Sequence, residues 1–122
     1  MSRSRVRLGE IGEDLAVREL ERLGYAILAR RYRTPRGEID IIASDGPAVV
    51  FVEVKTREGS AFGSAAEAVT TMKRRRLIET ARDYLGRRHL HDGPCRFDVV
   101  TIALSEDGPV VEVVRHAFDL TG

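Results

Sequence analysis

The segment AVVFVEVKT at residues 48–56 constrains the fold more than any other part of this sequence, because it is apolar on both faces for most of its length. A strand with this pattern is typical of the centre of a sheet that is covered on both sides. Side chains alternate between the faces of a strand, so Glu53 and Lys55 share one face with Phe51. The sequence therefore places an acid and a base side by side where apolar residues would pack better.

The elements before this strand follow from periodicity and turn residues. We expect a helix over residues 5–23 that ends at Gly24, because glycine accepts the backbone conformation found just after a helix C-terminus. Residues 25–32 and 38–43 are expected to be strands, with a turn at residues 34–37 between them. These two strands and the central strand would form an antiparallel meander.

A second helix and two strands are expected after the central strand. Ser64 and Glu67 match a capping box, so a long helix is predicted to begin at Ser64 and to end near Gly86. Residues 96–104 and 110–118 are predicted to be the last two strands. The order αβββαββ predicts an α/β fold with a mixed five-stranded sheet flanked by helices, and a chain of residues 1–122 has the length of one domain.

Composition narrows the class of protein. Apolar residues make up 43% of the 122 residues, an ordinary value for a globular chain. Cys95 is the single cysteine, which excludes an intramolecular disulfide and fits a reducing compartment. The sequence shows no secretory signal and no apolar run of the ~18 residues that a membrane helix needs. We therefore expect a soluble, cytoplasmic protein without a membrane partner.

Asp40 lies on the strand that precedes the central one, thirteen residues before Glu53. Neighbouring strands are about 4.8 Å apart, so a register that sets Asp40 opposite or diagonal to Glu53 brings two carboxylates together. These carboxylates repel each other unless a cation intervenes, and Mg²⁺ binds one or two protein carboxylates plus waters and phosphate oxygens. With Lys55 to orient a water or hold a phosphate oxygen, the pattern suits metal-dependent phosphodiester hydrolysis. An ordinary ion pair between Glu53 and Lys55, with Asp40 at a strand end, accounts for these residues equally well.

Two charged residues lie on or beside the apolar faces of the expected helices. Helical periodicity places Glu13 on the same face as Ala16 and Leu20, where a free carboxylate is costly to bury. Lys73 lies beside the stripe that contains Leu77. Either residue could belong to a functional site. Equally, the helix dipole could stabilise Glu13, and Lys73 could extend along apolar surface to reach solvent. Because the first helix has a second apolar stripe, the pattern does not decide which of its faces is buried.

One further acid, Asp98, lies within the otherwise apolar strand at residues 96–104. An ion pair with a basic residue of a helix, or a contact at the strand end, explains it better than catalysis does. The three histidines do not have the spacing of a metal site. The candidate chemistry is therefore restricted to the acids and lysines described above.

Basic residues gather in two parts of the chain. Residues 29–36 hold four arginines and no acid, and residues 70–91 hold seven lysines and arginines against two acids. Such clusters suit a polyanion, although basic runs on helices are most often solvated faces. The predicted nucleic-acid-binding residues are Arg31, Arg33, Arg36, Arg57, Lys73, Arg74, Arg75 and Arg76.

Two motifs, GEID at residues 37–40 and FVEVKTR at residues 51–57, resemble the signature of the PD-(D/E)XK nuclease superfamily. Over nearly its whole length, the chain also resembles the YraN-like family of uncharacterised bacterial proteins. The features that carry this wider resemblance include the two motifs, Gly12-Glu13, Lys73 and the segment RFDVV at residues 96–100. The resemblance implies a restriction-endonuclease-like core of three layers.

The resemblance also implies roles for particular residues. The implied catalytic residues are Glu13, Asp40, Glu53 and Lys55, of which the three acids are the implied metal ligands and Lys55 is the catalytic lysine. The implied cofactor is Mg²⁺ or Mn²⁺. Ile39 replaces the proline of the nominal motif without altering a metal ligand, and Lys73 stands where some relatives carry a glutamine.

Two classes of function follow from the residues and the resemblance. The first is a Mg²⁺- or Mn²⁺-dependent endonuclease, with DNA favoured over RNA as substrate and branched DNA included by analogy with resolvases. The second is a non-catalytic nucleic-acid-binding or assembly protein that retains the nuclease fold. A homodimer is compatible with cutting two strands, but no feature of the sequence specifies one.

Overall fold

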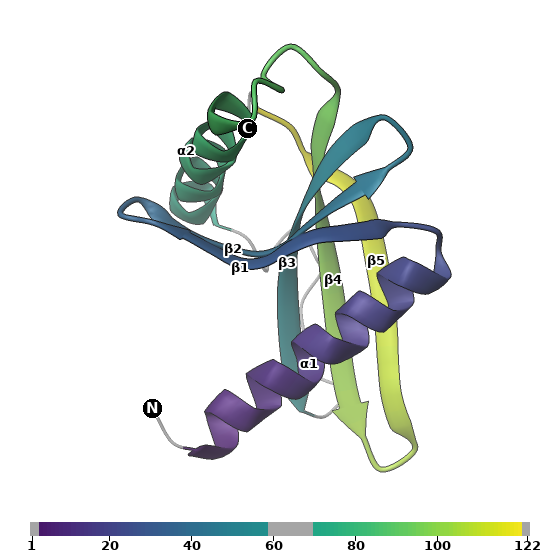
Figure 1. The fold of residues 1–122 in the computed structure, drawn as a ribbon. Helices are drawn as coiled ribbons and strands as arrows, with labels where there is room; N and C mark the ends of the chain where they lie inside the picture. Colours follow the sequence, from purple (N-terminus) through teal and green to yellow (C-terminus); the bar gives the residue numbers. More distant parts are fainter. Residues whose placement is uncertain (1–2, 59–69, 121–122) are drawn as a thin grey trace.

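The computed structural model describes residues 3–58 and 70–120, with side chains for residues 8–57 and 70–120. In this part of the chain, two helices and five strands follow the predicted order αβββαββ. Their bounds are α1 (Arg3–Arg22), β1 (Ala26–Thr34), β2 (Gly37–Asp45), β3 (Ala48–Glu58), α2 (Thr71–Arg87), β4 (Cys95–Ser105) and β5 (Gly108–Phe118). The strands form one sheet in the order β1-β2-β3-β4-β5 (Figure 1). Because β3 and β4 are parallel and the other neighbours are antiparallel, the predicted mixed sheet is confirmed.

The central strand β3 contributes to the core on both of its faces. On one face, Val52 packs with Ala16 and Leu20 of α1. On the other face, Phe51 packs with Leu77 of α2. The two helices therefore cover opposite faces of the sheet (Figure 1). This arrangement confirms the prediction of three layers and is consistent with a restriction-endonuclease-like fold.

Strands β2 and β3 separate partway along their length. They are paired from Asp45↔Ala48 to Ile41↔Val52. Past that pair, β3 continues beside β4 as far as Glu58↔Leu104, whereas β2 remains paired with β1. Figure 1 shows the β1–β2 ribbon turning toward α2 while β3 runs in another direction. We call the point past Ile41↔Val52, where the two strands diverge, the fork.

Helix α2 begins later than the sequence predicts. The capping box at Ser64 and Glu67 lies outside the described residues. Thr70 is the N-cap, with extended backbone (φ −71°, ψ 163°), and its hydroxyl accepts a hydrogen bond from the Lys73 N–H. A continuous helix from Ser64 is therefore wrong, because an extended residue with a capping hydroxyl sets the beginning of the helix at Thr71.

Helix α1 lies unusually close to β3 at Gly12. A Cβ atom added to Gly12 would overlap the side chain of Thr56. The absence of a side chain at Gly12 therefore lets the helix approach the strand just past the fork, and the next residue of the helix is Glu13. Neither helix in the described residues is both long enough and apolar enough to cross a membrane.

Candidate active site

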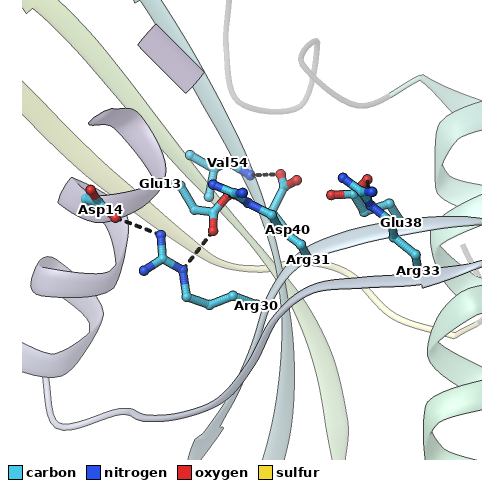
Figure 2. Close-up of polar contacts among 8 residues, drawn as sticks. All are labelled: Glu13, Asp14, Arg30, Arg31, Arg33, Glu38, Asp40 and Val54. Carbon is cyan, nitrogen blue, oxygen red and sulfur yellow. Dashed lines mark hydrogen bonds and ion pairs between the residues drawn. The ribbon is translucent and has the colours of Figure 1, made fainter. Parts of the chain in front are cut away.

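Asp40 and Glu53 are the first residues of β2 and β3 past the last pair before the fork. The Asp40 carboxylate accepts a hydrogen bond from the Val54 N–H at 2.8 Å, so it occupies the position where the ladder between the strands stops (Figure 2). Burial raises the pKa of Asp40 to about 7, and the nearby charge of Glu53 contributes to the same rise. The structure thus brings together the two carboxylates that the hairpin pattern predicted.

Glu53 is 6% exposed and its carboxylate forms an ion pair with Lys73 of α2. The alternative of a pair between Glu53 and Lys55 is wrong, since Lys55 forms no ion pair within the described part of the chain. The ammonium group of Lys73 therefore ends on a buried carboxylate rather than in free solvent. The charge of Lys73 also lowers the pKa of Asp40. This effect is smaller than the rises caused by burial and by Glu53, and smaller than the lowering caused by the Val54 N–H.

Glu13 is held between two arginines of β1. Its Oε1 accepts a hydrogen bond from Arg30 Nε at 2.8 Å, and its Oε2 accepts one from Arg31 Nε at 3.2 Å. Arg30 also donates to Asp14, at 2.7 Å (Figure 2). Consecutive residues of a regular strand face opposite ways, but Arg31 has a φ of 53°, which breaks the alternation. Both oxygens of the Glu13 carboxylate are therefore occupied.

An open cleft of about 650 Å³ lies between the N-terminal half of α1 and the fork. Asp40 and Lys55 line it from β2 and β3, Glu13 lines it from α1, and Arg31 lines it from β1. Glu53 contacts Lys73 on the α2 side of the sheet. The cleft thus exposes one of the two paired acids to solvent, next to a lysine and an arginine whose donor groups are not all used within the described residues.

Comparison with known proteins places this arrangement in a family. The uncharacterised protein family UPF0102 matches residues 12–102. This range includes the residues of the cleft and the fork described above, from Glu13 to Lys73. The chain belongs to this family. A UPF0102 protein of Moorella thermoacetica is 48% identical over 97% of this chain and 100% of its own length. Similar proteins of Symbiobacterium thermophilum (48% over 92% of this chain and 96% of its own) and Geobacter sulfurreducens (46% over 93% and 89%) carry the same family name.

The basic residues predicted to bind nucleic acid are spread over several surfaces of this UPF0102 chain. Arg31 and Arg33 line the cleft, and Arg33 is also paired with Glu38. Arg74 is not directed to the cleft, because its guanidinium lies 5.2 Å from the centre of the Phe118 ring. Lys73 is paired with Glu53. The other members of the set take no part in an ion pair among the described residues, namely Arg36, Arg57, Arg75 and Arg76.

Asp98 belongs to a separate buried network on the α1 side of the sheet. Its carboxylate accepts hydrogen bonds from the Tyr25 hydroxyl at 2.8 Å, from Arg96 Nε at 3.0 Å and from the His116 N–H at 2.9 Å. The ion pair expected for Asp98 is thus present, but its partner is Arg96 of the same strand rather than a helix residue. Since His116 has a φ of 53°, the carboxylate also satisfies an irregular turn of the neighbouring strand. Asp98 therefore has a structural explanation.

The contact between Arg30 and Glu13 was not predicted. From the sequence, Arg30 is one of several arginines in a basic cluster and nothing links it to Glu13. Strand alternation would also direct the side chains of Arg30 and Arg31 to opposite faces of the sheet. The positive φ of Arg31 that brings them together falls on a residue with no special preference for that conformation, so the sequence carries no signal for it.

Two carboxylate side chains at the fork are of the kind that a hard divalent cation prefers as ligands. In the stretches that the structure describes, no group of three acidic, histidine or cysteine side chains is arranged around one point. Mg²⁺ and Mn²⁺ need only one or two protein carboxylates, because waters and substrate oxygens complete the shell. Asp40 and Glu53 would supply such a pair, and a bound cation would relieve the repulsion between them. Glu13 fits this role less well, because both of its oxygens are bonded to arginines.

Proposed function

We propose that this chain is a Mg²⁺- or Mn²⁺-dependent nuclease that hydrolyses phosphodiester bonds in nucleic acid, with DNA favoured over RNA by the resemblance to PD-(D/E)XK nucleases. The observation that carries the proposal is the pair of carboxylates at the fork. Asp40 and Glu53 are neighbours, Asp40 is open to the cleft, and Lys55 lines the same cleft.

A purely structural role does not account for this pair. Burial and the charge of Glu53 both make ionised Asp40 unfavourable, so the folded chain carries an electrostatic cost at the fork. A protein that only bound polyanions would gain nothing from two acids beside a phosphate. Hydrolysis gives them a purpose, because a cation between them would turn the repulsion into binding energy.

Each residue of the site has a distinct task in this proposal. Asp40 and Glu53 would hold the cation, which when bound polarises the phosphodiester and lowers the pKa of water. Lys55 would orient the attacking water or hold a non-bridging phosphate oxygen through its ammonium group. The Val54 N–H fixes the Asp40 carboxylate, so this ligand is already oriented before anything binds. Arg31 and Arg33 would contact phosphates along the cleft.

The test is cleavage of a panel of labelled substrates with Mg²⁺ and with Mn²⁺. The panel holds duplex, flap, four-way-junction and single-stranded DNA, plus single-stranded RNA. The variants are Asp40→Asn and Lys55→Ala, with Glu112→Gln as a matched control because Glu112 is an exposed acid on β5. The proposal predicts metal-dependent cutting that both site variants abolish and the control retains.

Two other results would overturn the proposal. Cutting that survives in Asp40→Asn and Lys55→Ala would assign the activity to other residues or to a contaminant. Binding without cutting on every substrate, equal in wild type and variants, would instead support a non-catalytic nucleic-acid-binding protein.

A further inference from the structure

Arg31 has a backbone conformation that arginine rarely adopts. Its φ of 53° lies in the left-handed region, which costs a residue with a side chain about 1 kcal/mol or more. The result of this strain is specific, because the side chains of Arg30 and Arg31 both reach the carboxylate of Glu13. Strained residues of this kind cluster at functional sites, where the surrounding structure holds them in place.

The contacts of Arg31 leave most of its guanidinium unused. Its Nε donates to Glu13, and it has no other hydrogen-bond or ion-pair partner among the residues that the structure describes. A guanidinium has five N–H groups, so four remain available. The Arg31 side chain is 45% exposed and lines the cleft together with Asp40 and Lys55. Arg30 is different, because it is bonded to both Glu13 and Asp14.

We propose that Glu13 is a positioning residue that orients Arg31 so that its terminal nitrogens bind a backbone phosphate of the nucleic acid in the cleft. The inference rests on the proposed function and deepens it by assigning a phosphate site and by giving Glu13 a role other than metal binding. Arg30 holds the other oxygen of the Glu13 carboxylate, so each oxygen of Glu13 contacts one arginine.

The chemistry of the contacts favours this role over direct metal binding. A guanidinium bonded through Nε to a carboxylate still presents an edge of two nitrogens, which matches two oxygens of a phosphate. A cation bound to Glu13 would instead lie close to the two guanidinium groups that pair with its carboxylate, which is repulsive.

The two roles predict opposite effects of Glu13→Gln on nucleic-acid binding without metal. Removing a negative charge beside the cleft strengthens polyanion binding if charge alone matters. If Glu13 orients Arg31, the same substitution weakens binding, because the neutral amide holds the guanidinium less firmly. Asp14→Asn is the matched control, since Asp14 also pairs with Arg30 but forms neither a hydrogen bond nor an ion pair with Arg31 in the described part of the chain.

The experiment measures the affinity of a labelled single-stranded DNA, and of RNA of the same sequence, in EDTA over a series of salt concentrations. A second arm measures Mn²⁺ affinity by calorimetry. We expect Glu13→Gln and Arg31→Asn to weaken binding of both probes about tenfold and to reduce the salt slope by about 0.7, as for loss of one phosphate contact with a single strand. Asp14→Asn should bind at least as tightly as wild type. Mn²⁺ affinity should be unchanged in Glu13→Gln.

Arg31→Asn keeps the test decisive if Glu13→Gln folds poorly. Asparagine tolerates the left-handed region better than most residues, and the Arg31 side chain is partly exposed. Equal or tighter binding by both variants, or loss of Mn²⁺ affinity in a folded Glu13→Gln, would overturn the inference while leaving the nuclease proposal intact. A wild-type chain that binds neither probe would also overturn the phosphate site assigned to Arg31, and the nuclease proposal would still be decided by the cleavage panel.

Discussion

At the scale of single residues, the fork holds a carboxyl group, that of Asp40, whose ionised form is unfavourable. The pKa of Asp40 rises from its ordinary value of 3.8 to about 7, mainly through burial and then through the charge of Glu53. The folded chain therefore retains a proton that the unfolded chain releases near pH 4. Stability is expected to fall as the pH rises from about 4 to about 7 and to be level above that range, because an acid whose folded pKa is raised destabilises the fold once it ionises.

Asp40→Asn should remove this effect. The asparagine oxygen can still accept the Val54 N–H, but the position carries no charge. In EDTA, we expect the variant to be more stable than wild type by a few kcal/mol at pH 8 and equal to it below about pH 4. Urea denaturation at several pH values measures the difference. Adding Mg²⁺ at pH 8 should stabilise wild type and not the variant. Parallel pH profiles for the two chains would refute the raised pKa.

The sequence predicts contacts between single residues only where the backbone is regular. Strand alternation and a short hairpin bring Asp40 next to Glu53, and both rules depend on regular backbone. The contacts of Glu13 depend on the irregular backbone of Arg31, and the partner of Glu53 depends on how α2 packs, so neither could be derived from local pattern.

At the scale of elements, two contacts position the helices against β3. Gly12 lets α1 approach Thr56, and the ion pair between Lys73 and Glu53 joins α2 to the same strand. A hydrogen bond of 2.7 Å from the Tyr32 hydroxyl to Asp83 attaches the β1–β2 ribbon to α2. The sequence predicted the elements themselves, but the later beginning of α2 depends on Thr70, which competes with an equally good capping signal upstream.

Gly12→Ala should lower the free energy of unfolding by about 1–3 kcal/mol, because the new methyl group overlaps the stiff side chain of Thr56. The matched control is Gly9→Ala in the same helix, where an added Cβ meets nothing within 4 Å. Alanine there should stabilise the chain by about 0.5–1 kcal/mol. Urea denaturation of both variants measures the contrast. Equal effects at the two positions would mean that α1 does not approach β3 as described.

Lys73→Met should destabilise the metal-free chain by about 1–2 kcal/mol, because it leaves the buried Glu53 carboxylate without its cation. The value is modest because the Lys73 side chain is 41% exposed. Arg75→Met is the control on the same helix, and its effect should stay within about 0.5 kcal/mol, as for an exposed residue. In a double-mutant cycle, Lys73→Met should cost much less in a Glu53→Gln background. Additive effects would show that the two side chains do not interact.

At the scale of the whole molecule, a three-layer sandwich presents one cleft where acids and bases from α1, β1, β2 and β3 meet. The order of elements and the central position of β3 could be predicted because they depend on hydrophobic pattern. The cleft itself could not, because it results from how far β2 and β3 diverge and how α1 crosses them.

Affinity for nucleic acid should depend steeply on salt if the cleft binds the phosphate backbone. With Arg31, Arg33 and Lys55 each in contact with a phosphate, the slope of log K against log salt concentration is expected to be about −2 for a single strand. Fluorescence anisotropy between low and high salt in EDTA gives this slope. A flat response would exclude phosphate contacts in the cleft.

Asp40 and Glu53 are proposed to bind a cation together, and calorimetric titration of Mn²⁺ into the metal-free chain at pH 8 measures whether they do. We predict that wild type binds Mn²⁺, that Asp40→Asn and Glu53→Gln each weaken binding at least about tenfold by removing a ligand charge, and that Glu112→Gln leaves it unchanged. A wild-type chain that binds no Mn²⁺, or fork variants that bind it as tightly as wild type, would mean that Asp40 and Glu53 are not a cation site.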